Sequence, residues 1–278
     1  MLYLILAVLT SAAVSLVMRL SVDHVKNNIS MLSMCYLSCS ILGGLHALSG
    51  HIRLSGEGLP VTVGIGIAAS VLLLSGFLCL QMNVKVNGVV LSGVFAKLGV
   101  LVPTLLSVLL FKERPGVLQI TGFVLAILAI LVINSGQDSG KAGSKAALIL
   151  LLLINGLVDF MSKIYEEVGS TDLQDLYLLI SFFAALILSI LLAICKKQHL
   201  AAADVGFGLL LGIPNYYASR FLIKALNTVP AVVAYPTYSV ATIVVIAVAG
   251  LLLFREKLSR RQMTGMAIIL AALALLNL

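Results

Sequence analysis

The chain has 278 residues, of which 61% are hydrophobic and 10% charged, and its formal net charge is +7. A soluble domain carries about 25% charged residues, so this composition excludes a water-exposed globular surface. The Lys and Arg residues stand singly or in pairs rather than in one long basic run, so the positive charge does not indicate nucleic-acid binding.

Long apolar segments follow one another from the N-terminus onward. The first, MLYLILAVLT, lacks the basic region and cleavage site of a signal peptide, so we expect it to be retained as a membrane helix. Each segment has about 20 residues, enough for a helix to cross a hydrocarbon core of about 30 Å, and the short alternating segments of a β-barrel are absent from the sequence. Ten spans are predicted, at residues 2–20, 29–48, 60–82, 88–110, 115–134, 145–164, 174–195, 205–226, 231–253 and 261–277.

The composition and spans predict an all-α, multi-pass integral membrane protein embedded in a lipid bilayer. We expect the inner membrane of a bacterium, because the chain is compact and carries no soluble extension.

A charged motif occurs twice in the chain. The stretch FKERPGVLQITG at residues 111–122 is repeated as FREKLSRRQMTG at residues 254–265, which is 143 residues later. The first and sixth predicted helices also correspond, at an offset of 144 residues, through Ser11, Ser15 and Arg19 in one and Asn155, Asp159 and Lys163 in the other. The chain is therefore predicted to contain a duplicated five-helix unit.

The Gly- and Ser-rich stretch SGQDSGKAGSK separates the two units. Its composition is typical of a flexible linker. We therefore divide the chain into a first repeat at residues 1–135, a linker at 136–144 and a second repeat at 145–278. Because five is an odd number of spans, the second unit begins on the other side of the membrane, and the repeats are predicted to be inverted, as in many secondary carriers.

The sequence resembles the EamA-like ten-helix carriers of the drug/metabolite transporter superfamily. The resemblance rests on the repeated Glu-containing turn, the Gln-x-Thr-Gly motif after it and the basic residue that ends the first helix of each repeat, namely Lys112-Glu113-Arg114, Arg255-Glu256-Lys257, Arg19 and Lys163. It implies transport of amino acids, metabolites, nucleotide sugars or toxic compounds, with both termini in the cytoplasm.

The distribution of positive charge predicts the opposite orientation. The odd-numbered connections between spans hold eleven Lys and Arg residues and the even-numbered connections hold five. The positive-inside rule then places the odd-numbered connections in the cytoplasm and both termini outside it. The two orientations remain alternatives at this point.

Three ionisable residues lie deep within predicted spans, where charge is costly and commonly functional. They are Lys97, Asp159 and Arg220. Each also has a structural interpretation, because Asp159 lies one helical turn from Lys163 and Arg220 lies close enough to a helix end to reach the interface.

Other polar residues predict a cavity shared between helices. Asn155 lies on the same helix face as Asp159, and Asn215 follows a mid-span proline. Tyr235 and Tyr238 share a face of the ninth span and suit a pocket that is apolar with a few polar points, although a hydrogen-bonded seam between helices would have the same pattern.

These residues favour a substrate with a carboxylate or phosphate group, alone or together with an amine. Lys97 and Arg220 are predicted to neutralise the anionic group. Asp159 is predicted to pair with the amine or to carry the coupling proton.

The favoured function is secondary active transport of a small polar metabolite, such as export of an amino acid or a related compound, through a central cavity by alternating access. One alternative is a translocase of a lipid-linked, phosphate-bearing head group, and another is a structural membrane subunit without transport activity. An enzyme is not expected, because the histidines lie at or near span ends and His-Glu-x-x-His is absent. No catalytic residue, cofactor or metal site is predicted, and the four cysteines fit apolar core positions.

Overall fold

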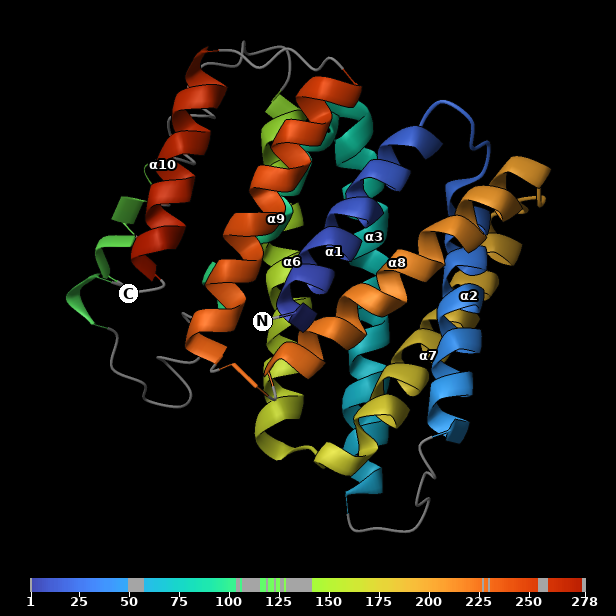
Figure 1. The fold of residues 1–278 in the computed structure, drawn as a ribbon. Coiled ribbons are helices and arrows are strands. Elements are labelled where there is room, and N and C mark those ends of the chain that lie inside the picture. The colour runs from blue at the N-terminus through green and yellow to red at the C-terminus, as the bar shows by residue number, and fades with distance from the viewer. Residues whose placement is uncertain are drawn as a thin grey trace.

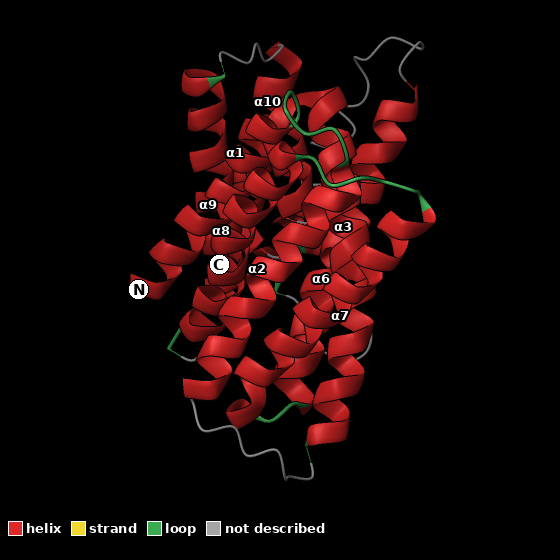
Figure 2. Ribbon diagram, turned by 90° about the vertical axis from the view of Figure 1, so that its right-hand side faces the viewer, coloured by secondary structure: helices red, strands yellow, loops and turns green. Residues whose placement is uncertain are grey.

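The computed structural model describes residues 2–49, 58–103, 106, 116–118, 120–122, 124–125, 128, 142–226, 228–229, 231–254 and 260–276. The described part is helical and contains no β-strand (Figure 2). Its helices are α1 (Leu2–Ser21), α2 (Asn28–Ser49), α3 (Leu59–Leu98), α6 (Ala142–Val168), α7 (Gln174–Cys195), α8 (Ala202–Leu226), α9 (Ala231–Leu253) and α10 (Arg260–Leu276), with a short 3-10 turn at Thr171–Leu173.

Most predicted spans match these helices closely. The bounds of α7 and α9 are as predicted, and those of α1, α2, α8 and α10 differ by three residues or fewer at either end. Helix α6 begins at Ala142, so the last three residues of the predicted linker are helical. The predicted span 115–134 lies largely outside the described residues, and the charged turns 111–115 and 255–259 lie outside them altogether.

Five described segments are long and apolar enough to cross a membrane. They are Leu2–Ser21, Asn28–Leu48, Leu59–Pro103, Lys145–Tyr165 and Gln174–Cys195. Large apolar side chains such as Ile5, Leu191 and Ile194 are exposed on the outer faces of these helices. Exposed apolar surface of this extent indicates contact with lipid, and the protein is an integral membrane protein.

Helix α3 reverses direction at Gly88. The backbone of Gly88 has φ 80° and ψ 168°, outside the helical region, and a positive φ of this kind favours glycine. A straight helix would separate Gly76 and Gly99 by about 35 Å. Both instead pack against the same part of α6, because Gly76 lies beside Ile154 and Gly99 lies beside Gly156. The break at Gly88 thus lies one residue beyond the predicted connection between spans 60–82 and 88–110.

Corresponding helices of the two predicted repeats run in opposite directions. In Figure 1, α1 rises from the N-terminus while α6 descends, and α2 descends while α7 rises. The connections from α1 to α2 and from α7 to α8 meet at the upper end of the bundle in this view. The connection from α6 to α7 lies at the lower end.

Helices α2 and α8 approach each other through two glycines. A Cβ atom added to Gly208 would collide with the carbonyl oxygen of Met31, and one added to Gly212 would collide with that of Cys35. The spacing of four residues puts both glycines on one face of α8, so the backbones of the helices come into contact. Small residues four positions apart commonly permit such close approach of membrane helices.

We therefore expect Gly208→Ala and Gly212→Ala each to reduce the free energy of unfolding by about 1–3 kcal/mol, because backbone atoms cannot make room for the added methyl group. The measurement is thermal unfolding of the detergent-solubilised protein. Gly206→Ala is the matched control on the same helix, since no atom lies within 4 Å of its added Cβ. Equal melting temperatures for the three variants would contradict this account of the packing.

Candidate functional site

A cavity of about 180 Å³ lies among helices α1, α3, α6, α7, α8 and α9. At about 30 Å³ for each water molecule in the liquid, this volume corresponds to roughly six waters. Pockets for drug-sized ligands are larger, at about 300–1,000 Å³. The cavity therefore suits a small metabolite.

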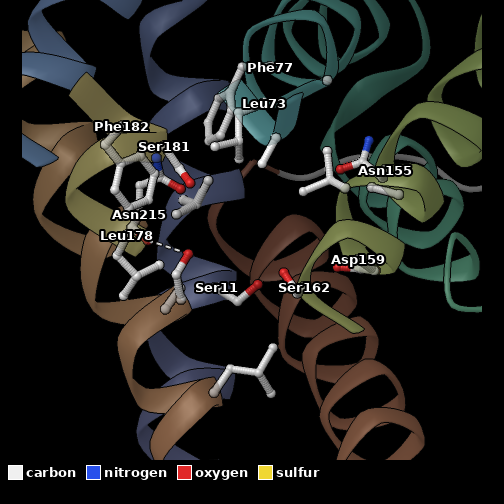
Figure 3. Close-up of a pocket in the computed structure, with 18 of the residues that line it drawn as sticks. Ser11, Leu73, Phe77, Asn155, Asp159, Ser162, Leu178, Ser181, Phe182 and Asn215 are labelled. Atoms are coloured by element: carbon white, nitrogen blue, oxygen red, sulfur yellow. Dashed lines mark hydrogen bonds between the residues drawn. The ribbon is translucent and has the colours of Figure 1, made fainter. Parts of the chain in front are cut away.

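Polar side chains line two opposite sides of this cavity. Asn155, Asp159 and Ser162 project from one face of α6, and Ser181 of α7 and Asn215 of α8 lie across from them (Figure 3). The rest of the wall is largely apolar, with Leu73, Phe77, Leu178, Phe182, Leu222 and Ile223 among its residues. A ligand with polar groups on an apolar body matches this lining.

Lys97 is the only basic residue, and Asp159 the only acidic one, among the described residues that line the cavity. Lys97 Nζ donates a hydrogen bond of 3.0 Å to Tyr238 Oη and lies 4.1 Å from the centroid of that ring. The Asp159 carboxylate interacts electrostatically with Lys97. No described residue forms an ion pair or hydrogen bond with that carboxylate, so it is available to a ligand.

A contact between two glycines sets the distance between the helices that carry this charge pair. An added Cβ at Gly99 would lie 2.7 Å from the Gly156 nitrogen, and one at Gly156 would lie 2.5 Å from the Gly99 oxygen. Gly99 is two residues from Lys97, and Gly156 is three residues from Asp159. The close approach of α3 and α6 therefore brings the two charged side chains to one cavity.

Both cavity asparagines have their amide NH2 groups engaged by the protein. Asn155 Nδ2 donates to the Leu151 carbonyl oxygen at 2.9 Å. Asn215 Nδ2 contacts Cys39 Sγ at 3.5 Å and Cys35 Sγ at 3.8 Å. The Oδ1 atoms are then the amide atoms left to accept hydrogen bonds from a ligand.

The structure does not bring Arg220 to the cavity. Its guanidinium forms a two-pronged ion pair with Asp175 of α7, with Nε and one terminal nitrogen each 3.2 Å from a carboxylate oxygen. The geometry thus replaces the predicted substrate contact of Arg220 with a contact between α7 and α8. The alternative pairing of Asp159 with Lys163 is also not formed, because Lys163 Nζ lies 2.8 Å from Glu167.

The cavity thus collects Lys97, Asp159, Asn155, Asn215 and Tyr238 from the predicted site. The side chain of Tyr235 lies outside the described part of the structure. Ser11 and Ser15 of α1, which align with Asn155 and Asp159 at the offset of 144 residues, also line the cavity, as do residues that sequence reasoning missed, including Ser162, Tyr177, Ser181 and Ser219. Single serines in apolar spans carry no recognisable sequence signal, so these lining residues could be identified only from the structure.

Within the described residues, no group of three or more His, Cys, Asp or Glu side chains is placed to hold a metal ion.

These features define a multi-pass helical membrane protein with a cavity that one cation, one acid and several neutral polar side chains line. The chain matches the model of the EamA-like transporter family over residues 1–135 and again over residues 145–278, and it belongs to that family. Members of this family are transporters rather than enzymes, so the assignment indicates a membrane transporter.

Two further comparisons each cover most of this chain. An uncharacterized protein of Haemophilus influenzae is 25% identical over 223 residues, which cover 78% of this chain and 75% of that protein. A solved crystal structure is similar with a TM-score of 0.68 at 16% identity, over 99% of this chain and 94% of the other. At this identity, the likeness establishes a shared fold alone.

The hydrogen bond from Lys97 to Tyr238 generates a prediction about stability. Tyr238→Phe keeps the ring but removes the acceptor of a charged donor, so we expect a loss of about 1.5–3 kcal/mol in the free energy of unfolding. The measurement is thermal unfolding of the purified protein without added ligand. Tyr216→Phe on α8 is the control, since the buried Tyr216 hydroxyl has no hydrogen-bond partner among the described residues. Similar melting temperatures for the two variants would contradict the expected role of the Tyr238 hydroxyl.

Proposed function

We propose that this protein is a secondary active transporter of a small polar metabolite, an amino acid or a related compound, which it exports by alternating access. The observation that carries the proposal is the placement of Lys97 and Asp159, one cation and one acid, at a single cavity within the membrane-spanning bundle. Charged residues at such a depth are costly and mark substrate or ion pathways.

The two charges match a zwitterionic substrate. The ammonium group of Lys97 has three N–H donors and uses one for Tyr238, so others remain for a substrate carboxylate. The Asp159 carboxylate and the side-chain Oδ1 atom of Asn155 lie one helical turn apart, and both can accept hydrogen bonds from the amine of the substrate. The anion-binding role falls to Lys97 alone, because Arg220 is paired with Asp175.

We assign the coupling proton to Asp159 as part of the same proposal. A carboxylate that faces the cavity without a direct protein partner can bind either a proton or the substrate amine. Competition between the two for one acid would link movement of the substrate to movement of protons.

Alternating access requires two related halves on either side of the cavity. We propose that residues 1–135 and 145–278 are these halves, arranged as inverted five-helix repeats with ten membrane helices in all. The opposite directions of α1 and α6, and of α2 and α7, support the inversion. The bacterial source of the Haemophilus influenzae relative supports placement in a bacterial inner membrane.

The test is ligand binding followed by transport. Purified protein is screened by thermal unfolding against amino acids and phosphorylated metabolites, because a ligand at 100 times its dissociation constant stabilises the folded state by about 2.7 kcal/mol. A ligand that stabilises the protein is then followed in proteoliposomes, with and without a proton gradient. We expect an amino acid or related compound to bind and to be transported.

Lys97→Met and Asp159→Asn are each expected to weaken binding of that compound at least about tenfold, because each removes one of two complementary charges in a buried site. The matched controls are Lys163→Met and Glu167→Gln on α6, which alter an ion pair that does not line the cavity. Near-normal binding and coupled transport by the two cavity variants would refute the proposal. Binding of lipid head groups in place of free metabolites would favour a lipid-linked substrate.

A further inference from the structure

A buried carboxylate joins two connections at one end of the bundle. Asp204, in the first turn of α8, is fully buried. Its Oδ1 atom accepts hydrogen bonds from the backbone nitrogens of Lys26 at 2.9 Å and Asn27 at 3.3 Å, which lie between α1 and α2. Its Oδ2 atom accepts one from the Ala201 nitrogen at 3.2 Å. We call this group of contacts the Asp204 clasp.

Further hydrogen bonds join the same two connections. Asn27 Nδ2 donates to the His199 carbonyl oxygen at 2.7 Å, and the Ser30 nitrogen donates to Gln198 Oε1 at 3.4 Å. All of these partners lie between α7 and α8, whereas the donors lie before residue 31. The Asp204 clasp therefore ties the first half of the chain to the second at this end.

A second group of contacts joins the halves at the opposite end. Thr62, in the first turn of α3, lies with its Oγ1 atom 3.5 Å from the hydroxyl of Tyr165 at the end of α6. That hydroxyl donates to the Ser170 carbonyl oxygen at 2.9 Å, and an added Cβ at Gly58 would lie 3.3 Å from the Ser170 side chain. We call this group the Thr62 clasp.

The two clasps occupy corresponding places in the proposed repeats. Each joins the first turn of the third helix of one repeat to the end of the first helix, or the connection after it, in the other repeat. The connection from α1 to α2 lies at the upper end of the bundle in Figure 1, and the connection from α6 to α7 lies at the lower end. The cavity lies between the two ends.

We propose that the Asp204 clasp and the Thr62 clasp are the two gates of the carrier, and that their unequal strength makes the substrate-free protein open at the Thr62 end. This inference rests on the proposed transport function. In an alternating-access cycle, one end opens while the other stays closed, so contacts between the halves at each end must break in turn.

The difference in strength follows from charge. Two hydrogen bonds to the Asp204 carboxylate cross between the halves, from the Lys26 and Asn27 nitrogens, and such charge-assisted bonds are roughly twice as strong as neutral ones. Across the Thr62 clasp, the described residues make one contact between neutral hydroxyls at the long distance of 3.5 Å, and the hydrogens of both hydroxyls are donated to the Gly58 and Ser170 carbonyl oxygens. Among the described residues of the two clasps, opening at the Thr62 end thus breaks fewer and weaker polar contacts between the halves.

The test measures distances across each clasp by double electron–electron resonance between spin labels. One pair joins Asp23→Cys to the native Cys195, which is exposed, whereas Cys35, Cys39 and Cys79 are buried. The other pair, in a Cys195→Ser background, joins Val61→Cys to Val168→Cys, at two exposed positions. For the first pair, across the Asp204 clasp, we expect a single short distance. For the second pair, across the Thr62 clasp, we expect a short distance and a second, longer one.

Asp204→Ala is expected to increase the ratio of the long-distance population to the short-distance population across the Asp204 clasp at least about tenfold. The long component across the Thr62 clasp should decrease at the same time. Thr62→Val is expected to increase the long component at its own end and to leave the Asp204 end closed. Asn27→Ala, which removes the neighbouring hydrogen bond from Asn27 Nδ2 to the His199 carbonyl oxygen, should shift the same ratio as Asp204→Ala by a smaller factor.

Asp172→Asn is the matched control, since this exposed acid lies at the Thr62 end and takes no part in either clasp. Distances that stay unchanged in folded Asp204→Ala and Asn27→Ala, or that lengthen at both ends together, would overturn the gate assignment. The distances are measured without substrate. An absence of transport would therefore count against the proposed function, and unchanged distances would count against the gates.

Discussion

Lipid cannot solvate the charges of Lys97 and Asp159, and this constraint accounts for much of the arrangement of the bundle. A charge among acyl chains needs a protein or water environment, so the helices that bear these residues have to enclose them. Helices α1, α3, α6, α7, α8 and α9 surround the resulting cavity. Tyr238 adds both a hydrogen bond and its aromatic face to the Lys97 ammonium, which offsets part of the hydration that the cation loses.

Enclosure of this kind requires helices to approach closely without the hydrophobic effect that drives soluble proteins together, because lipid is as apolar as the side chains. Contacts between backbones at small residues supply van der Waals attraction instead. Gly208 and Gly212 bring α8 against α2, and Gly99 meets Gly156 where α3 crosses α6. Each contact joins a helix that precedes residue 104 to one that follows residue 141, so glycine positions hold the two halves of the chain around the cavity.

The features that the sequence predicts well are those with a local cause. Apolar length predicts the helices, and the spacing of Asn155 and Asp159 predicts a polar face on α6. Contacts between distant segments have no such signal. Arg220 lies 45 residues from Asp175, its partner on the preceding helix, and no local pattern indicates that ion pair. The contacts of Asp204 have no local signal either, since the backbone donors of Lys26 and Asn27 lie more than 170 residues away.

The proposed repeats share a fold but differ in chemistry. At the predicted offset of 144 residues, Asp159 in the second half corresponds to Ser15 in the first, and an offset of 139 residues pairs Arg220 with Gln81. Arg220 has Asp175 as its partner, whereas the buried Gln81 carboxamide has no hydrogen-bond partner among the described residues. In a carrier of the kind we propose, two identical halves would give two oppositely open states of equal free energy in the absence of a membrane potential. Because the charged member of each pair lies in the second half, the proposed carrier would have two states of unequal free energy, and divergence of the two halves would set its resting state.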